Sequence, residues 1–359
     1  MKNKIRAIAL YLPQFHPIPE NDLWWGKGFT EWTNVGKAKR LFPGHEQPRV
    51  PTELGYYDLR VPETRQAQAE MAREAGVEGF AYWHYWFGGG KTLLERPFRE
   101  VLESGKPDFP FCLAWANHSW YDKTWNKDGT DRLLIEQTYP GDEDYEQHFL
   151  YVLKAFQDPR YIRVDEKPVF MVYEPCDSPK INDVMDLWRD LAVRHGLPGV
   201  YFIALAHWKK DLAKLREFHY DAVSYDPLFD FRFERKTLRS LVSATAHKVL
   251  GIPKIQRYKD YVEYFRKHFP QNQDYIPAVN PNYDHTPRSG KYGVVLVGDT
   301  PEVFGELLKT AGQPGYLDHH KLMILRSWNE WAEGNYLEPD LRHGRGYLDA
   351  LKLVLREKE

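Results

Sequence analysis

The sequence predicts an α/β fold, a single (β/α)8 TIM barrel, on three observations. Eight short apolar segments alternate with helical patterns along 359 residues, which is typical of βα units on a parallel sheet. The length exceeds the roughly 250 residues that such a barrel commonly needs, so there is room for long loops. Two connections are in fact much longer than the others. We therefore expect residues 1–359 to form one barrel domain without a domain boundary.

Eight candidate strands follow one another along the chain. They are residues 5–12, 77–86, 109–116, 168–173, 200–206, 221–226, 275–281 and 321–327. The first one follows basic residues, like the apolar part of a signal peptide, but it is too short and no small-residue cleavage site follows it. No apolar stretch reaches the roughly 18 residues of a transmembrane helix. We therefore expect a cytoplasmic protein without a membrane segment.

Three helices can be predicted from their ends and their apolar faces. Thr300 can cap a helix that starts with proline and stops at Gly312, an arrangement that suits the two ends of a helix. The same pattern repeats between Pro62 and Gly76. A last amphipathic helix from about Tyr347 is expected to close the barrel.

The two long connections follow the first and the third strand. One runs from residue 13 to about residue 61, and the other from Asn117 to about Gly141. Barrel enzymes build their active sites from the loops at the carboxyl ends of the strands. Both connections are therefore candidates for a binding site rather than linkers.

The composition favours a neutral or modestly charged ligand. The formal net charge is −2 and basic residues are not clustered, so we expect no nucleic-acid or membrane-surface partner. Cys112 and Cys176 form no C-x-x-C pattern, which fits a reducing compartment. Many of the 12 tryptophans stand beside Asn, His, Asp or Glu. Aromatic faces next to hydrogen-bonding groups suit a groove for an oligosaccharide or polysaccharide.

Polar and aromatic side chains gather at the predicted carboxyl ends of the strands and in the long loops. Trp24, Trp25, Trp86, Trp115 and Trp328 are candidate stacking platforms for sugars. The other candidate substrate-binding residues are Gln14, His16, Glu31, Trp32, Tyr82, His84, Tyr85, Asn117, His118, Tyr173, Glu174, His207, Tyr225, Asp226, Asp284, Arg288 and Asn329.

Glu330 and Glu333 are the candidate catalytic residues. They follow the last strand in the segment SWNEWAEGNYLEPD. Glycoside cleavage needs one carboxylic acid to protonate the leaving oxygen and a second carboxylate as nucleophile or base. Burial beside Trp328 and Trp331 would raise the pKa of the one that stays protonated. The spacing equally fits a helix start, where carboxylates interact with the helix dipole.

Two other enzyme classes have less support in the sequence. Metal-binding patterns such as H-x-H or H-E-x-x-H do not occur, and the two histidines at 319 and 320 precede the last strand, at the opposite end of the barrel. No G-x-G-x-x-G or P-loop occurs, and the acidic run at residues 142–144 is better explained as a helix start than as a manganese site. The sequence therefore predicts no metal and no cofactor.

Several long motifs resemble the glycoside hydrolase family 99-like group, which includes WbsX-type polysaccharide-biosynthesis proteins. The motifs are YLPQFHPIPENDLWWGKGFTEWTNV, LGYYDLR, GFAYWHYWF, WAN, DPRYI, KPVFMVY and WNEWAEGNYLEPD. The resemblance runs from Leu10 nearly to the C-terminus and implies a (β/α)8 barrel related to retaining endo-α-mannosidases. In those relatives a glutamate of an E-W-x-E motif deprotonates the 2-hydroxyl of the sugar, which attacks its own anomeric carbon to give a 1,2-anhydro sugar. The resemblance thus implies that Glu330 is this base and that Glu333 is the acid and then the base.

The chain departs from this family pattern at two places. His118 stands where many members have an acidic residue after W-A-N, and residues 283–288 read YDHTPR in place of WDN-x-PR, with Asp284 and Arg288 kept. These departures bear on which sugar is bound, so we do not name mannose as the expected substrate. Three hypotheses stay open: a retaining, endo-acting hydrolase of an α-linked glycan; a glycosyltransferase or transglycosylase in cell-surface polysaccharide or lipopolysaccharide assembly; and a non-catalytic carbohydrate-binding barrel.

Overall fold

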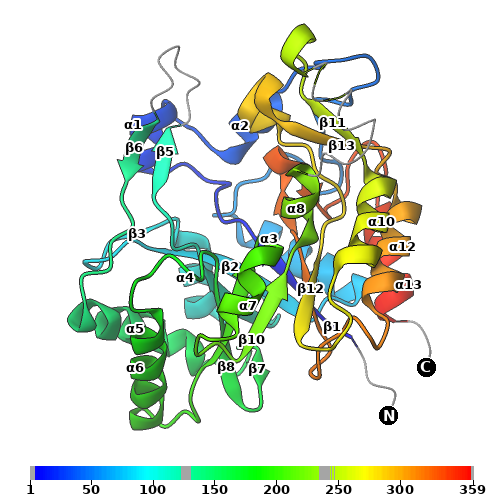
Figure 1. Ribbon diagram of the computed structural model, residues 1–359. Helices are drawn as coiled ribbons and strands as arrows, with labels where there is room; N and C mark the ends of the chain where they lie inside the picture. The colour runs from blue at the N-terminus through cyan, green and yellow to red at the C-terminus, as the bar shows by residue number, and fades with distance from the viewer. Residues whose placement is uncertain (1–4, 123–130, 234–242, 244, 246, 357–359) are drawn as a thin grey trace.

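Eight parallel strands close into a barrel in the computed structural model (Figure 1). The structure describes residues 5–122, 131–233, 243, 245 and 247–356. Each strand pairs with the next one along the chain, and β1 pairs with both β2 and β14, which closes the ring. The barrel strands are β1 (Arg6–Tyr11), β2 (Gly79–Trp86), β4 (Phe111–Trp115), β8 (Lys167–Val172), β9 (Tyr201–Ala206), β10 (Ala222–Tyr225), β12 (Tyr275–Val279) and β14 (Leu322–Leu325). The predicted barrel and its eight strands are confirmed.

Helices cover the outside of the barrel. They are α3 (Pro62–Ala75), α4 (Arg96–Ser104), α5 (Asp142–Phe156), α6 (Ile181–Arg194), α7 (Leu212–Leu215), α10 (Tyr258–His268), α12 (Pro301–Ala311) and α13 (Gly346–Leu355). The predicted helix ends are confirmed, since the Thr300 side chain accepts from Val303 N at the start of α12 and Gly76 ends α3 with φ +88°. α13 packs against α12 and α3 and completes the helical layer. Among the described residues, no helix is both long and apolar enough to cross a membrane.

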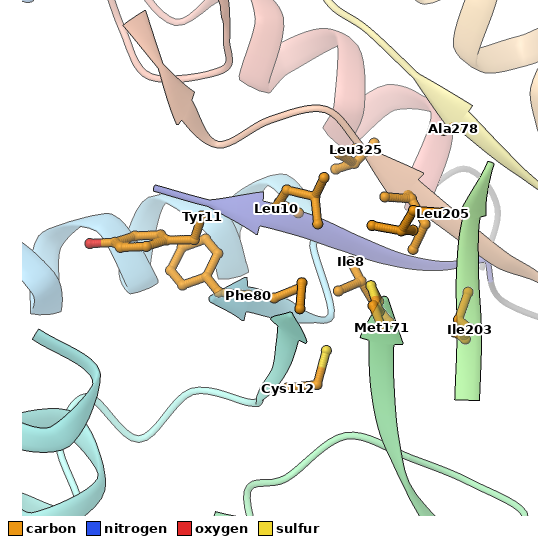
Figure 2. Packing of buried hydrophobic residues seen from close by; sticks show 14 of the residues in the cluster. Ile8, Leu10, Tyr11, Phe80, Cys112, Met171, Ile203, Leu205, Ala278 and Leu325 are labelled. Atoms are coloured by element: carbon orange, nitrogen blue, oxygen red, sulfur yellow. The ribbon is translucent and has the colours of Figure 1, made fainter. Parts of the chain in front are cut away.

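The barrel interior is apolar at its centre. Figure 2 shows Ile8, Leu10, Met171 and Leu205 in the buried hydrophobic cluster, and all four side chains are almost fully buried. Successive side chains of a strand point to opposite faces, so every second residue faces this interior and the others face the helices. The interior core fixes the register of the strands and thereby decides which residues reach the barrel mouth.

Long loops cover the carboxyl ends of the strands. The loop after β1 contains α1 (Pro19–Trp25) and α2 (Glu31–Lys37), and the loop after β4 contains the hairpin of β5 (Trp120–Asp122) and β6 (Arg132–Ile135). The predicted connection from Asn117 to about Gly141 is therefore confirmed as a hairpin-bearing loop, although its residues 123–130 lie outside the described part.

The sequence did not predict a second layer of short elements over β10, β12 and β14. β10 is followed by α8 (Pro227–Phe233) and β11 (Lys254–Arg257), and β12 is followed by α11 (Thr286–Ser289) and β13 (Val294–Val297). β11 and β13 pair with each other in parallel, apart from the barrel sheet. β14 continues into a small hairpin of β15 (Asn329–Glu330) and β16 (Asn335–Tyr336). Two more two-residue strands, β3 (Thr92–Leu93) and β7 (Arg163–Val164), pair antiparallel with β2 and β8.

Candidate active site

Glu330 and Glu333 lie on one tight turn at the carboxyl end of the barrel. Residues 331–333 form a single 3-10 turn between β15 and β16, and Gly334 ends it with φ +70°. A Cβ atom on Gly334 would lie 2.7 Å from the backbone nitrogen of Asp284, so a side chain has no room there. The same close approach lets Asp284 N–H donate to the carbonyl of Glu333 at 2.7 Å. The turn is therefore fixed against the α11 loop, and it does not start a helix.

Arg288, on α11, joins the two glutamates. Its Nη2 donates to Glu330 Oε2 at 3.1 Å and its Nη1 donates to Glu333 Oε1. Its Nε donates to Glu31 Oε1 at 2.8 Å, so three carboxylates share one guanidinium. The turn, α11 and α2 pack together at this point, which brings three distant parts of the chain into one site.

The two glutamates have different protonation preferences. Burial raises the pKa of Glu330 to about 7, Arg288 opposes this shift, and the charge of Glu333 adds to it. Burial also raises the pKa of Glu333, but Arg288, His285, Arg326 and further cations outweigh it and the pKa falls below its usual value. One carboxylate beside a cation thus stays ionised while its neighbour holds the proton near neutral pH.

The side chains of Trp328 and Trp331 are buried beneath the backbone of the turn. Both rings are 0 % exposed, so neither is available to stack on a sugar. Trp331 stacks on Tyr336 at 3.8 Å, and Trp328 packs on Phe80 of β2 at 5.1 Å. These positions agree with the prediction that the glutamate pair lies beside buried tryptophans. They do not agree with the prediction that Trp328 stacks on a sugar.

Glu338 is a buried carboxylate that the sequence analysis did not single out. Its Oε2 accepts from Trp331 Nε1 at 2.6 Å and from the hydroxyl of Tyr57 at 2.8 Å, and its Oε1 accepts from Gln68 Nε2 at 2.6 Å. Burial raises its pKa to about 7 in spite of these donors. Glu338 therefore anchors the indole between the two glutamates to α3 and to the first long loop.

The barrel mouth next to the pair is lined by polar and aromatic side chains that meet across the interior. Trp83 of β2 lies 5.3 Å from the ring of Tyr173, and Tyr173 lies 4.5 Å from His207. Arg326, at the end of β14, pairs with Asp226 at 3.2 Å and approaches His207 Nδ1 at 3.5 Å. β14 and β9 are not neighbours in the sheet, so these contacts cross the barrel. Tyr173, His207 and Asp226 are thus brought together as the sequence predicts.

Five of the candidate residues point to the helices instead. Tyr82 packs against Phe98 of α4, and His84 bonds to His148 of α5 at 2.7 Å between their Nε2 atoms. The others in this group are Trp86, which stacks on His148; Trp115, which also packs on His148; and Tyr225, which bonds to Asp230. Strand alternation explains this, because these residues occupy outward positions while Trp83 and Tyr85 of β2 face inward.

Three further candidates are used within the protein. Asp284 accepts from Gln47 Nε2 at 2.7 Å and contacts His45 Nε2 at 2.9 Å, which ties the first loop to α11. The Asn329 side chain bonds to both backbone groups of Leu12. In the same way, the Asn117 side chain bonds to both backbone groups of Glu174 and joins the ends of β4 and β8. These residues position the loops of the site.

The remaining candidates form the rim of the site. Tyr85 is a buried residue of β2, and burial raises its pKa most strongly, while the charge of Glu330 raises it further and that of Arg288 opposes the shift. Its ring lies 5.1 Å from Trp120, which in turn contacts Trp24 at 5.9 Å and Trp25 at 6.4 Å.

The first loop supplies the other rim residues. Gln14 and His16 are buried where the loop leaves β1, and the Gln14 carbonyl accepts from Glu31 N–H at 2.9 Å. The His16 ring instead bonds to the Pro13 carbonyl, and the charges that act on its pKa are those of Asp58, Arg60 and Arg96, so among the described residues no contact joins it to the glutamate pair. Trp32 packs on Trp331 at 5.4 Å. On the opposite side of the mouth, the His118 ring lies 5.2 Å from Tyr173, and Glu174 lies 4.0 Å from His207.

Trp83, Trp120 and Arg326 belong to the site but are missing from the sequence prediction. Trp83 could have been predicted from the alternation of side chains along β2, since it lies on the same inward face as Tyr85. Arg326 follows directly on an apolar strand, which is the same signal that selected the other strand-end residues. Trp120 is reached only through the fold of the β5–β6 hairpin, for which the sequence has no comparable signal.

Comparison with solved structures shows that the fold occurs in other proteins. The fold matches a glycoside hydrolase-like protein with a TM-score of 0.61 at 15% sequence identity, covering 99% of this chain and 94% of the other. It also matches the family 99 endo-α-mannosidase from Bacteroides thetaiotaomicron with a TM-score of 0.56 at 17% identity, covering 98% and 96%. The fold is thus shared with the barrels of these two proteins.

The chain belongs to the WbsX family. The model of this family, described as glycosyltransferase WbsX, matches residues 7–351. Two uncharacterized WxcX proteins from strains of Xanthomonas campestris pv. campestris are each 34% identical over 356 residues, which is 97% of this chain. The chain spans about half the length of these relatives, since the match covers 49% of them.

Proposed function

We propose that this protein is a retaining glycoside hydrolase that cleaves an α-linked glycan within the chain, with Glu330 and Glu333 as its catalytic pair. The observation that carries the proposal is the single turn on which both carboxylates contact Arg288. Two carboxylates with separated pKa values at the carboxyl end of a barrel suit acid and base chemistry on a glycosidic bond. The family membership and the fold of the endo-α-mannosidase support a sugar substrate.

The proposed mechanism uses the sugar's own 2-hydroxyl. Glu330 takes the proton of this hydroxyl, and the oxygen attacks the anomeric carbon while the bond to the leaving oxygen breaks and Glu333 gives that oxygen a proton. Glu333 then deprotonates water, which opens the 1,2-anhydro ring at the anomeric carbon, and Glu330 returns the proton to the 2-oxygen. Two inversions give net retention.

These roles place a demand on Arg288. The ion pair with Arg288 keeps Glu333 ionised and leaves the proton on Glu330, whereas the proposed first step needs the proton on Glu333. Arg288 contacts both groups, so a shift of the guanidinium toward Glu330 and Glu31 exchanges their preferences. We therefore expect glycan binding to weaken the contact between Arg288 and Glu333.

The roles can be separated with an activated substrate. A glycosyl fluoride needs no protonation of its leaving group, so Glu333→Gln is expected to keep most of its turnover of the fluoride and Glu330→Gln to lose it. If Glu330→Gln is the variant that keeps turnover, the two roles are reversed and the protonation preferences of the structure already match the catalytic ones.

The proposed reaction is tested with a panel of bacterial and plant polysaccharides and α-linked oligosaccharides. New reducing ends are followed by proton NMR for the wild-type protein and for Glu333→Gln. We expect new anomeric signals that first appear in the configuration of the substrate and are missing from the variant. Signals that first appear in the opposite configuration would exclude a retaining mechanism.

A second candidate is glycosyl transfer in the assembly of a cell-surface polysaccharide, and the description of the matching family model favours it. The same pair can pass the anomeric carbon to a sugar hydroxyl if the site excludes water. Product that forms only with an activated donor and an acceptor glycan, and none with polysaccharide alone, would identify a transferase. A barrel that binds glycans with unchanged affinity but turns over none of them would be a binding protein.

A further inference from the structure

Three arginines surround the glutamate pair, and one of them has no carboxylate partner among the described residues. Arg288 bonds to Glu31, Glu330 and Glu333, and Arg326 pairs with Asp226. Arg232, on α8, instead donates from Nη1 to the hydroxyl oxygen of Tyr283 at 2.7 Å. Arg232 thus forms no direct ion pair with a carboxylate of the described residues, although its charge lowers the pKa values of Glu333 and Asp226.

Aromatic rings hold the Arg232 side chain in place. The guanidinium carbon lies 4.7 Å from the ring centroid of Tyr283 and 5.0 Å from that of Phe229. Its Nε is buried and has no hydrogen-bond partner among the residues that the structure describes. Rings and a phenol orient a guanidinium but do not neutralise it. The group is therefore preorganised and keeps donors for an anion.

Arg232 lies on the same side of the mouth as the candidate catalytic residues. The ring of Tyr283 stacks 6.1 Å from His285, whose Nε2 lies 3.8 Å from Glu333 Oε1. Phe229 is shared with the interior, since it lies 5.4 Å from the guanidinium of Arg326 and 4.5 Å from the ring of His207. These contacts connect the surroundings of Arg232 both to Glu333 and to the barrel interior.

We propose that Arg232 and the hydroxyl of Tyr283 form an anion subsite that binds the carboxylate of a uronic acid residue next to the cleaved bond. The inference deepens the proposed function and rests on it, because it makes the substrate an acidic polysaccharide. One free guanidinium suits a singly charged carboxylate. The diphosphate of an activated donor needs more positive charge, and Arg326 and Arg288 are already paired.

The test compares each acidic polysaccharide with its own carboxyl-reduced form, which differs only in the charged group. Binding is measured by affinity electrophoresis and calorimetry in a Glu333→Gln background, so that turnover does not interfere. We expect at least one acidic polymer to bind about tenfold to a hundredfold more tightly than its reduced form. Adding Arg232→Met should bring this ratio to about one, and Arg232→Lys should keep part of the preference because it keeps the charge.

Arg216→Met is the matched control. Arg216 also lies over an aromatic ring, 5.9 Å from that of Tyr275, and pairs with Asp274 at 3.1 Å, but it is at the opposite end of the barrel. This variant should keep the full preference. Equal thermal midpoints for the Arg232 and Arg216 variants establish that both are folded.

Three outcomes overturn the inference. In the first, no acidic polymer is preferred over its reduced form; in the second, the preference persists in Arg232→Met. In the third, a sugar phosphate competes with the bound polymer through Arg232 while a methyl uronoside does not, which makes the ligand group a phosphate. Failure of the proposed function is distinct: it would appear as Arg232-dependent binding of an acidic polymer that the wild-type protein does not cleave.

Discussion

Arg288 donates a hydrogen bond from Nη2 to Glu330 Oε2 at 3.1 Å. The same guanidinium also holds Glu333 and Glu31, so one guanidinium bonds to three carboxylates. Three ionised carboxylates at this spacing repel each other, and the lowest free energy is reached when one of them takes a proton. Glu330 is that group, with a pKa of about 7.

Replacing Arg288 by methionine is expected to destabilise the protein at neutral pH by about 3 kcal/mol or more, because the buried carboxylates lose their partner. Without the cation the folded-state pKa values of Glu330 and Glu333 rise. The loss should therefore shrink as the pH falls and both groups become protonated. Urea unfolding at pH 5 and pH 8 measures this. Arg288→Lys, which keeps the charge, should lose less, and an equal loss for Arg288→Met at both pH values would contradict the arrangement.

Glu330→Gln and Glu333→Gln are expected to change the pH dependence of stability in opposite directions. The folded-state pKa of Glu330 is raised, so its contribution is present below its unfolded value and is lost as the pH rises through about 7. Glutamine keeps the neutral form at every pH. Between pH 5 and pH 9 the free energy of unfolding of Glu330→Gln should therefore rise relative to that of the wild type by up to roughly 3 kcal/mol.

The shift at Glu333 has the opposite sign. Its folded-state pKa is lowered, so its contribution is present above the unfolded value and is lost as the pH falls through the folded one. Glu333→Gln should therefore lose stability relative to the wild type above that range and recover it in acid. Denaturant titrations of the three proteins across pH 3 to 9 test both shifts, and parallel curves for the two variants would be inconsistent with the assigned charges.

Glu338→Gln is expected to lower the free energy of unfolding by about 1 to 3 kcal/mol, because the new amide N–H2 group faces the N–H donors of Trp331 or Gln68 in a buried position. Glu306→Gln on α12 is a matched control, since Glu306 is exposed. Urea unfolding monitored by tryptophan fluorescence compares the two. A loss no larger than that of the control would mean that Glu338 does not hold the turn.

Tyr85→Phe and Tyr82→Phe test which face of β2 meets the glycan. Tyr85 lies on the inward face of β2 and its pKa responds to the charges of Glu330 and Arg288, whereas Tyr82 packs against Phe98 of α4. Loss of a hydrogen bond to substrate should lower kcat/KM by about tenfold for Tyr85→Phe. Tyr82→Phe should leave it unchanged. Steady-state kinetics on a cleaved glycan would refute the placement if the two variants behaved alike.

Much of the architecture follows from local patterns in the sequence. The run from Arg6 to Tyr11 and its seven counterparts are short, apolar and separated by helical segments, and such patterns depend on neighbouring residues alone. Thr300 and Gly312 mark the ends of a helix for the same reason. Glu330 and Glu333 could be picked out as candidate catalytic residues because two residues on one turn are also close in sequence.

The remaining features depend on contacts between distant segments. His84 and Tyr85 are adjacent in sequence, yet one bonds to α5 and the other faces the mouth, and this difference is set by the register of β2 in the closed sheet. Arg232 comes near Glu333 only through the layer of short elements formed by α8, β11 and β13. Glu338 meets Gln68 across 270 positions of the chain, a separation over which no sequence pattern extends.

In the proposed function, Glu330 and Glu333 together break a glycosidic bond. The most direct test is turnover of one cleaved polysaccharide by the wild-type protein, Glu330→Gln and Glu333→Gln at equal concentration, with products followed by proton NMR. We expect retained configuration for the wild type and losses of about a hundredfold to ten-thousandfold in each variant, with folding intact. Turnover near the wild-type rate in both variants would contradict the proposed function.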